Sequence, residues 1–201
     1  MSRLSENRTS RESSGPSPPP AEFSIEERRV LLGIAHQSIL SAFTGGAAEG
    51  APSRHLSDPR GVFTTLYLHG DLRGCVGYAM PNAPLYRAVS ETARAAAFED
   101  SRFLPVTEEE APQLDVSLSV LSRLFPIQAE EVEVGRHGLV VCLGVRRGLL
   151  LPQVPVENDW DRATFLEQTC RKAGLPFDAW RKGATLEAFT AEVFGDGDLS
   201  P

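Results

Sequence analysis

VFTTLYLHGDLRGCVG, residues 62–77, has the pattern of a β-hairpin. Its first half is rich in β-branched and aromatic residues, which favour strands. The dipeptide His69-Gly70 in the middle is typical of a two-residue turn between antiparallel strands. Apolar residues occur on both faces of the hairpin, so we expect the strand that carries Cys75 to be central in its sheet, although periodicity does not say which face is covered.

The turn fixes the predicted register of the hairpin, because each strand is counted outward from it. The predicted pairs are Leu68–Asp71, Leu66–Arg73 and Thr64–Cys75. In this register Arg73, Cys75 and Gly77 share one face of the second strand. A guanidinium near a thiol favours the thiolate, and glycine lets another group approach the backbone closely. Cys75 is therefore the candidate for reactivity, although for this motif alone the favoured interpretation is a small buried thiol with glycines at a bulge or a crowded crossing.

The composition is that of an ordinary globular protein. The chain has 201 residues, of which 41% are hydrophobic, which is enough for one substantial core or two small lobes. A formal net charge of −7 argues against a general nucleic-acid binder, since phosphate binding normally needs a basic surface.

The cysteines and the hydropathy pattern suggest a cytoplasmic protein. The three cysteines, at positions 75, 142 and 170, match neither a disulfide framework nor a zinc motif. The chain contains no apolar run long enough to span a membrane, and its N-terminus lacks the apolar stretch of a secretory signal. We therefore expect no membrane association, no metal and no cofactor.

The order of residue types predicts one folded domain with short tails. Residues 1–22 are rich in Ser, Pro and Arg and are expected to be disordered, the domain covers residues 23–195, and residues 196–201 form a flexible C-terminus. Ser24 and Glu27 make a capping box at the start of a helix that reaches Ala42. Gly45–Pro52 is predicted to be a mobile loop.

The rest of the chain mixes hairpins with helices, which indicates an α+β fold with a largely antiparallel sheet. A helix follows Asn82, a plausible N-cap, and a capping box at Thr107 starts at most a single turn because Pro112 follows. The remaining predicted elements are a strand over 115–121, a hairpin of 139–143 with 148–151, a helix capped by Asp159 or Asp161 that ends near Gly174, and a strand over 186–194.

Five segments taken together resemble the AMMECR-one domain family, whose bacterial and archaeal members are called AmmeMemoRadiSam system protein A. The segments are Gly61–Leu66, Leu72–Gly77, Ala97–Phe103, Gly135–Leu139 and Leu149–Val154. The resemblance extends over residues 23–195. Val76 and Ser101 depart from the common residues of the family, isoleucine and proline, without removing a chemical group. His69 stands where many members have asparagine, so we do not count it as catalytic.

The resemblance implies an α+β fold in two interleaved subdomains, with the Leu72–Gly77 segment beside the cleft between them. It also implies work alongside a Memo-like protein and a radical SAM protein, because members are often encoded beside or fused to these. It implies no particular reaction.

A thiol nucleophile needs a base, a group that orients the base, and donors for developing negative charge. Cys75, His137 and a carboxylate from Glu99 or Asp100 are the residue types required. Backbone N–H groups around Gly74 and Gly77 are candidate donors. A structural hydrogen bond in a turn is the competing role for His137.

Arginines offer a second kind of site. Arg73 has the planar fork that clamps a carboxylate or phosphate, and its competing role is a salt bridge to a carboxylate such as Glu99. Asp100 and Arg102 are further candidates for contacts with a substrate, or members of an ion-pair network at a helix end.

Two hypotheses follow for the function. In the first, the Leu72–Gly77 cleft binds a small anionic substrate, with Cys75 as the reactive thiol. In the second, the same segment is a docking surface of a non-catalytic scaffold module for the Memo-like and radical SAM partners. Family and fold do not by themselves choose between them.

Overall fold

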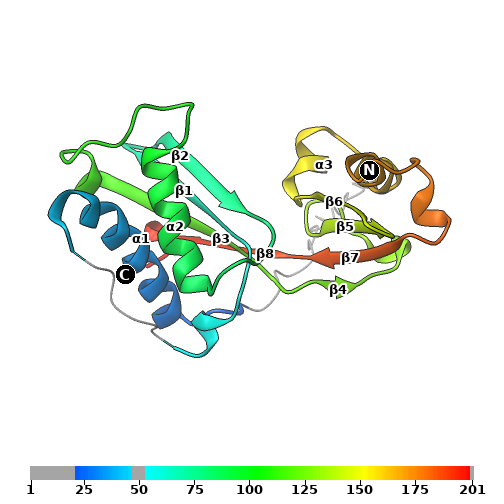
Figure 1. Cartoon of the computed structure of the whole chain (residues 1–201), viewed down its shortest axis with the longest axis horizontal. Coiled ribbons are helices and arrows are strands. Elements are labelled where there is room, and N and C mark those ends of the chain that lie inside the picture. Colours follow the sequence, from blue (N-terminus) through cyan, green and yellow to red (C-terminus); the bar gives the residue numbers. More distant parts are fainter. Residues whose placement is uncertain (1–20, 47–52, 200–201) are drawn as a thin grey trace, which may run out of the picture.

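Two antiparallel four-stranded sheets form the framework of the protein (Figure 1). The computed structural model describes residues 21–46 and 53–199. The predicted tail up to residue 20 and the core of the predicted loop, residues 47–52, lie outside the described residues. The first sheet contains, in spatial order, β2 (Asp71–Tyr78), β1 (Val62–Leu68), β3 (Leu114–Leu121) and β8 (Ala191–Gly195). The second contains β4 (Phe125–Pro126), β7 (Thr185–Phe189), β5 (Gly138–Leu143) and β6 (Arg146–Leu150). The α+β class and the antiparallel pairing agree with the sequence.

Two helices, α1 (Ile25–Thr44) and α2 (Leu85–Phe98), lie on one face of the first sheet (Figure 1). The capping box predicted at the start of α1 is present, with the Glu27 N–H donating to the Ser24 hydroxyl at 3.2 Å and the Ser24 N–H donating to the Glu27 carboxylate at 3.0 Å. The prediction of Asn82 as the N-cap of α2 is wrong. The helix begins at Leu85 after Pro84, because the Leu85 N–H donates to the Asp58 carbonyl and ties the start of α2 to another segment.

The hairpin of β1 and β2 has the predicted turn but not the predicted register. Leu68 pairs with Asp71 as expected. A β-bulge then leaves Arg73 without an opposite residue, so Gly74 pairs with Leu66 and Cys75 pairs with Thr65. The predicted pairs Leu66–Arg73 and Thr64–Cys75 are therefore wrong by one residue.

The bulge decides which side chains of β2 face the helices. An added Cβ at Gly74 would meet the carbonyl of Ala96 in α2, so Gly74 faces the helices. Cys75 is the next residue along β2 and lies on the opposite, helix-free face of the first sheet. In β3 the predicted inward residues, Val116, Leu118 and Val120, are all buried in the core under α1 and α2.

The second sheet has its own helix layer. Helix α4 (Arg162–Lys172) begins at Asp161, one of the two predicted caps, whose carboxylate accepts the Thr164 N–H at 2.8 Å. Phe165 and Leu166 of α4 are buried against the sheet. The sequence missed the short helix α3 (Gln153–Glu157) and the two-residue strand β4.

The predicted single strand over 186–194 is two strands in two sheets. Strand β7 ends at Phe189 and β8 begins at Ala191. Thr190 lies between them and is held by Ser122, which donates its N–H to the Thr190 carbonyl and accepts the Thr190 N–H at its hydroxyl. The chain therefore crosses between the sheets twice, once after β3 and once at Thr190 (Figure 1).

A junction cluster joins the two sheets. Its buried members are Leu121 from β3, Val140 from β5 and Phe189 from β7, and Phe63 and Ala79 pack against them. The cluster covers one end of the helix-free face of the first sheet. Toward the other end of that face the side chains are half-buried or exposed, as at Cys75, Thr65, Tyr67, Ser117 and Val193.

The last described residues form a short helix that contacts the first sheet. The sequence assigns residues 196–201 to a flexible end, and the structure places Asp196–Leu199 in a 3₁₀ helix. The Asp196 carboxylate accepts the Val116 N–H at 2.7 Å.

None of the helices within residues 21–46 and 53–199 combines the length and apolar character needed to cross a membrane.

Candidate functional site

Cys75 lies in β2, half-buried, on the helix-free face of the first sheet. Its Sγ is 3.3 Å from the Oγ1 of Thr65, the residue directly opposite on β1. The Cys75 N–H donates to Asp100 Oδ2 at 2.9 Å, and the Cys75 carbonyl accepts from Arg102 Nη2 at 3.4 Å. The two polar groups of the Cys75 backbone therefore contact a single ion pair.

Asp100 and Arg102 form that ion pair in the segment just after α2. Arg102 donates through Nε to Asp100 Oδ1 at 2.9 Å and through Nη2 to Oδ2 at 2.7 Å, a bidentate arrangement. The carboxylate is nearly buried, with 7% of the Asp100 side chain exposed, whereas 57% of the Arg102 side chain is exposed. Solvent beside Cys75 thus meets mainly the cationic member of the pair.

The hydrogen bonds that Asp100 accepts lower the pKa of its carboxyl group. Arg102, followed by the Cys75 N–H, holds the pKa of the Asp100 carboxyl well below its usual range. The pKa of the Arg102 guanidinium is raised, chiefly by its hydrogen bonds to Asp100. The pair is ionised at neutral pH.

Arg73 is engaged elsewhere. Its guanidinium donates to Glu110 through Nε at 3.2 Å and through Nη2 at 2.9 Å, and to the carbonyls of Leu104 and Pro105 at 2.7 Å and 3.2 Å. Only 13% of the Arg73 side chain is exposed, and Arg73 is the main cause of the lowered pKa of Glu110. A salt bridge was one of its two predicted roles, with Glu110 in place of Glu99 as the partner.

The glycines on either side of Cys75 are sites of close packing. A Cβ at Gly74 would lie 2.1 Å from the Ala96 carbonyl oxygen, and a Cβ at Gly77 would lie 2.5 Å from the Phe63 ring. Helix α2 and the Phe63 side chain therefore occupy the space that each glycine leaves. The role of the backbone N–H groups around Gly74 and Gly77 as donors to a substrate stays a prediction.

The structure does not bring His137 or Glu99 to Cys75. His137 precedes β5 in the second sheet and is 6% exposed, and its Nδ1 accepts the Glu133 N–H at 3.1 Å. Burial is the main cause of its lowered pKa. Glu99 is the exposed C-cap of α2. Among the described residues, no hydrogen bond or ion pair joins either side chain to Cys75.

The other two thiols have different surroundings. Cys170 in α4 is fully buried, and burial raises its pKa. Cys142 in β5 is half-buried and packs against the junction cluster.

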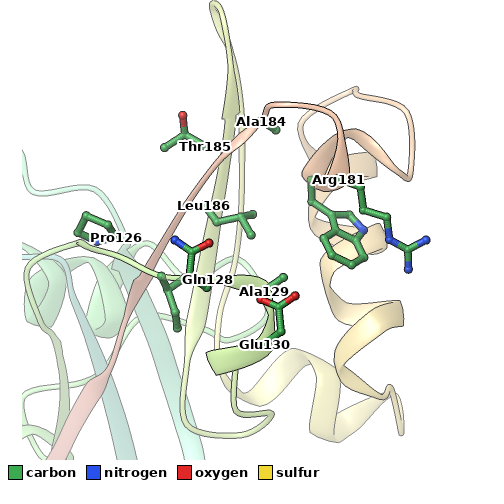
Figure 2. Close-up of a pocket in the computed structure, with 10 residues that line it drawn as sticks. Pro126, Gln128, Ala129, Glu130, Arg181, Ala184, Thr185 and Leu186 are labelled. Carbon is green, nitrogen blue, oxygen red and sulfur yellow. The ribbon is translucent and has the colours of Figure 1, made fainter.

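Two hollows in the described part of the chain lie away from Cys75. One, of about 460 Å³, lies in the second sheet between the segment that follows β4 and the segment that precedes β7. Figure 2 shows Gln128, Ala129 and Leu186 on one side of this hollow and Arg181 on the other. The second, of about 220 Å³, lies between the two sheets. Neither is lined by any of the site residues predicted from the sequence.

A family model described as AMMECR1 matches residues 32–194, most of the chain, including both sheets and the Cys75 segment. The chain belongs to the AMMECR1 family. This agrees with the resemblance drawn from the sequence.

Relatives of this AMMECR1 chain have names that state no activity. A protein of Methanosarcina acetivorans is 41% identical over 180 residues, which covers 84% of this chain and 90% of the relative. A protein of Aquifex aeolicus is 38% identical, covering 83% of this chain and 91% of the relative. The crystal structure of uncharacterized protein PH0010 from Pyrococcus horikoshii superimposes with a TM-score of 0.59 at 40% identity, covering 82% of this chain and 89% of that one.

Sequence reasoning about this AMMECR1 chain missed two contacts of the site. Thr65 was missed because the bulge at Arg73 shifts the register, and a bulge has no clear signal in a hairpin with a simple turn. Glu110 was assigned to a capping box, which it does form with Thr107, and its second role with Arg73 depends on how the loop after α2 folds back.

Proposed function

We propose that the helix-free face around Cys75 binds a small anionic molecule, with Arg102 holding its charge and the Cys75 thiol as the reactive group. The observation that supports this is the orientation of one ion pair. Asp100 is turned inward and fixes the Cys75 backbone, while the Arg102 guanidinium is exposed beside the thiol.

The exposed guanidinium gives the site its preference for anions. Arg102 has donors in a planar fork that suits a carboxylate or phosphate oxygen. Asp100 uses two of these donors, and the open side of Arg102 faces solvent. An anion there would lie close to Cys75, because Arg102 also contacts the Cys75 carbonyl.

The thiol can form a covalent bond with an electrophilic carbon on such a ligand. In that step the Cys75 proton passes to water, the sulfur forms the new S–C bond, and the leaving group departs with the electron pair of the bond that breaks. The Thr65 hydroxyl, 3.3 Å from the sulfur, can donate a hydrogen bond to the thiolate. The proposed ligand is therefore an anion with a reactive carbon near its charged end.

The proposal includes the partners that the family resemblance implies. The protein acts in a pathway with a Memo-like protein and a radical SAM protein, and the bound anion is a substrate in that pathway. The alternative is a scaffold module that docks these partners on the same face. Docking is the second candidate because the same open face extends across the first sheet, from Cys75 past the half-buried Tyr67 to the exposed Val193 on β8.

Competing alkylating agents test the site. Iodoacetate carries a carboxylate and iodoacetamide does not, so an anion site beside Cys75 should favour iodoacetate. We expect the rate of alkylation of Cys75 by iodoacetate, divided by its rate with iodoacetamide, to fall about threefold to tenfold in Arg102→Met. Peptide mass spectrometry measures both rates. Arg136→Met is the matched control, because Arg136 is a half-exposed arginine paired with Glu133 far from Cys75 in the sequence.

The same measurement compares the three thiols. We expect iodoacetamide to modify Cys75 faster than Cys142 and Cys170 in the folded protein. Equal rates at the three thiols, or an unchanged rate ratio in Arg102→Met, would contradict the proposal and leave the docking module as the better account.

A further inference from the structure

A pocket between the two sheets has features of a second binding site. It has a volume of about 220 Å³ and lies beside the junction cluster. Gly61 and Ala79 line it from the first sheet, and Arg147 and Phe189 line it from the second. The two halves of the molecule, each consisting of one sheet and the helices packed on it, therefore both contribute to the wall of the pocket.

The charged side chains in the wall are all cationic. Arg60, Arg123 and Arg147 line the pocket, and no aspartate or glutamate does. Arg60 and Arg123 have carboxylate partners, Glu22 and Asp58, that are not part of the lining. The interior of the pocket thus presents guanidinium groups without a carboxylate between them.

Arg60 keeps a buried donor without an acceptor. Only 5% of this residue is exposed, and its terminal nitrogens contact Glu22 and the Leu121 carbonyl. Its Nε is buried and has no hydrogen-bond partner among the residues that the structure describes. Buried unpaired donors are rare in folded proteins, and because this Nε has no accessible surface, a ligand acceptor in the pocket would reach it only after a shift of the Arg60 side chain.

Arg147 is free to move toward such a ligand. Its Nη2 lies 3.9 Å from Glu187, which is beyond hydrogen-bond distance, and 40% of its side chain is exposed. Its neighbour Arg146, by contrast, donates to the Gly174 carbonyl at 2.8 Å and does not line the pocket.

The remaining wall is mainly apolar. Leu121, Leu124, Met80 and Phe189 contribute side chains to it. The volume is below the range of about 300–1,000 Å³ that is typical for drug-sized ligands, so the occupant is small. Inorganic phosphate would leave this apolar surface unused.

We propose that the pocket binds a small organic carboxylate, whose charged end meets Arg60 and Arg147 and whose short apolar body packs against Phe189. The site is separate from Cys75, none of whose contacts with Thr65, Asp100 or Arg102 involves a lining residue. It depends on the two sheets keeping their arrangement, because the two arginines come from different halves of the molecule.

Hexanoate is a suitable probe, with 1-hexanol and inorganic phosphate as comparisons. We expect isothermal titration calorimetry of the full chain to show saturable hexanoate binding, with no measurable binding of hexanol, which lacks the charge, or of phosphate, which lacks the apolar body. The amide signals of Gly61 and Ala79 in ¹H–¹⁵N spectra should shift with hexanoate. Equal binding of phosphate, or hexanoate binding without shifts at these amides, would overturn the proposal.

Two neighbouring arginines provide matched variants. Arg147→Met keeps the length of the side chain and removes the charge at an exposed position, and we expect it to weaken hexanoate binding at least about tenfold. Arg146→Met should bind like the unmodified protein. Unchanged affinity in Arg147→Met, or an equal loss in both variants, would overturn the assignment. Substituting Arg60 would risk the fold, which is why Arg147 carries the test.

Discussion

Cys75 is flanked by two glycines that serve packing on opposite faces of the first sheet. Gly74 allows the backbone of α2 to approach, with the Ala96 carbonyl in the space where a side chain would begin. Gly77 allows the Phe63 ring to lie against β2 on the helix-free face. The two residues therefore set the height of the helix layer and the position of Phe63, and with them the surroundings of the thiol.

Gly74→Ala tests the first of these roles. A methyl group 2.1 Å from a backbone oxygen cannot be accommodated without moving α2, so we expect the free energy of unfolding to fall by about 1–3 kcal/mol or more. Gly33→Ala is the control, since Gly33 is an exposed position of α1 and no neighbouring atom outside its own helix backbone lies within 4 Å of an added Cβ. The free energy of unfolding of Gly33→Ala should rise by about 0.5–1 kcal/mol, because alanine favours helices more than glycine does. Urea unfolding of both variants measures the difference, and a Gly74→Ala protein as stable as the parent would contradict the packing argument.

At the scale of the element, β2 lies at the edge of the first sheet, so the prediction that it is a central strand is wrong. Hydrogen bonds occupy its outer backbone at Cys75. Edge strands invite pairing with other chains, and proteins commonly block them with charged side chains. Here Asp100 accepts the Cys75 N–H and Arg102 donates to the Cys75 carbonyl, so one ion pair takes the place of a neighbouring strand. Strand β8, the other edge, is treated similarly, since the Gly195 N–H donates to Asp198 at 2.7 Å.

The charge of Asp100 makes this edge contact sensitive to acid. Its pKa is lowered in the folded state, so ionised Asp100 stabilises the fold at every pH above its unfolded pKa of about 3.9. That stabilisation declines as the pH falls below this value toward the folded pKa, because the unfolded state then binds the proton first. We therefore expect Asp100→Asn to be less stable than the parent at neutral pH, with a gap that narrows only below about pH 4.

Urea unfolding at a series of pH values measures that gap. Asp115→Asn, at an exposed position on β3, is the control and should follow the parent. A gap between Asp100→Asn and the parent that stays constant into the acid range would show that geometry rather than charge holds the β2 edge.

Local signals were enough to predict most of these elements. The capping box at Ser24, the alternation of β3 and the carboxylate cap at Asp161 each depend on residues close together in the sequence, and each is present. The bulge at Arg73 and the division of the last strand at Thr190 depend on contacts with distant segments. For the same reason the sequence placed Asp100 and Arg102 among the candidates near Cys75 but could not show which of them is exposed, or that His137 belongs to the other sheet.

At the scale of the whole molecule, the two halves are tied together by chain crossings and a shared core. Phe189 lies at the end of β7, is 1% exposed, and belongs to the junction cluster with Leu121 of the first sheet. Gly138 leaves room for its ring, since a Cβ there would lie 2.2 Å from the Phe189 ring. This packing fixes the two sheets in the arrangement that forms the arginine-lined pocket.

The aromatic residues allow the coupling of the halves to be measured. Both tryptophans, Trp160 and Trp180, pack in the second half, while the three tyrosines, at positions 67, 78 and 86, belong to the first. Because the halves share a core and two crossings, we expect tryptophan fluorescence and tyrosine absorbance to report the same urea midpoint in the unmodified protein. Phe189→Ala should lower the stability by about 3–5 kcal/mol and separate the two midpoints, because the cavity removes the contact that couples them. Phe177→Ala, at a side chain that is 58% exposed, should change neither result. If the two signals report different urea midpoints in the unmodified protein, the junction does not couple the halves. At intermediate urea concentrations, molecules with one half unfolded would then lack the pocket, because its wall needs both halves.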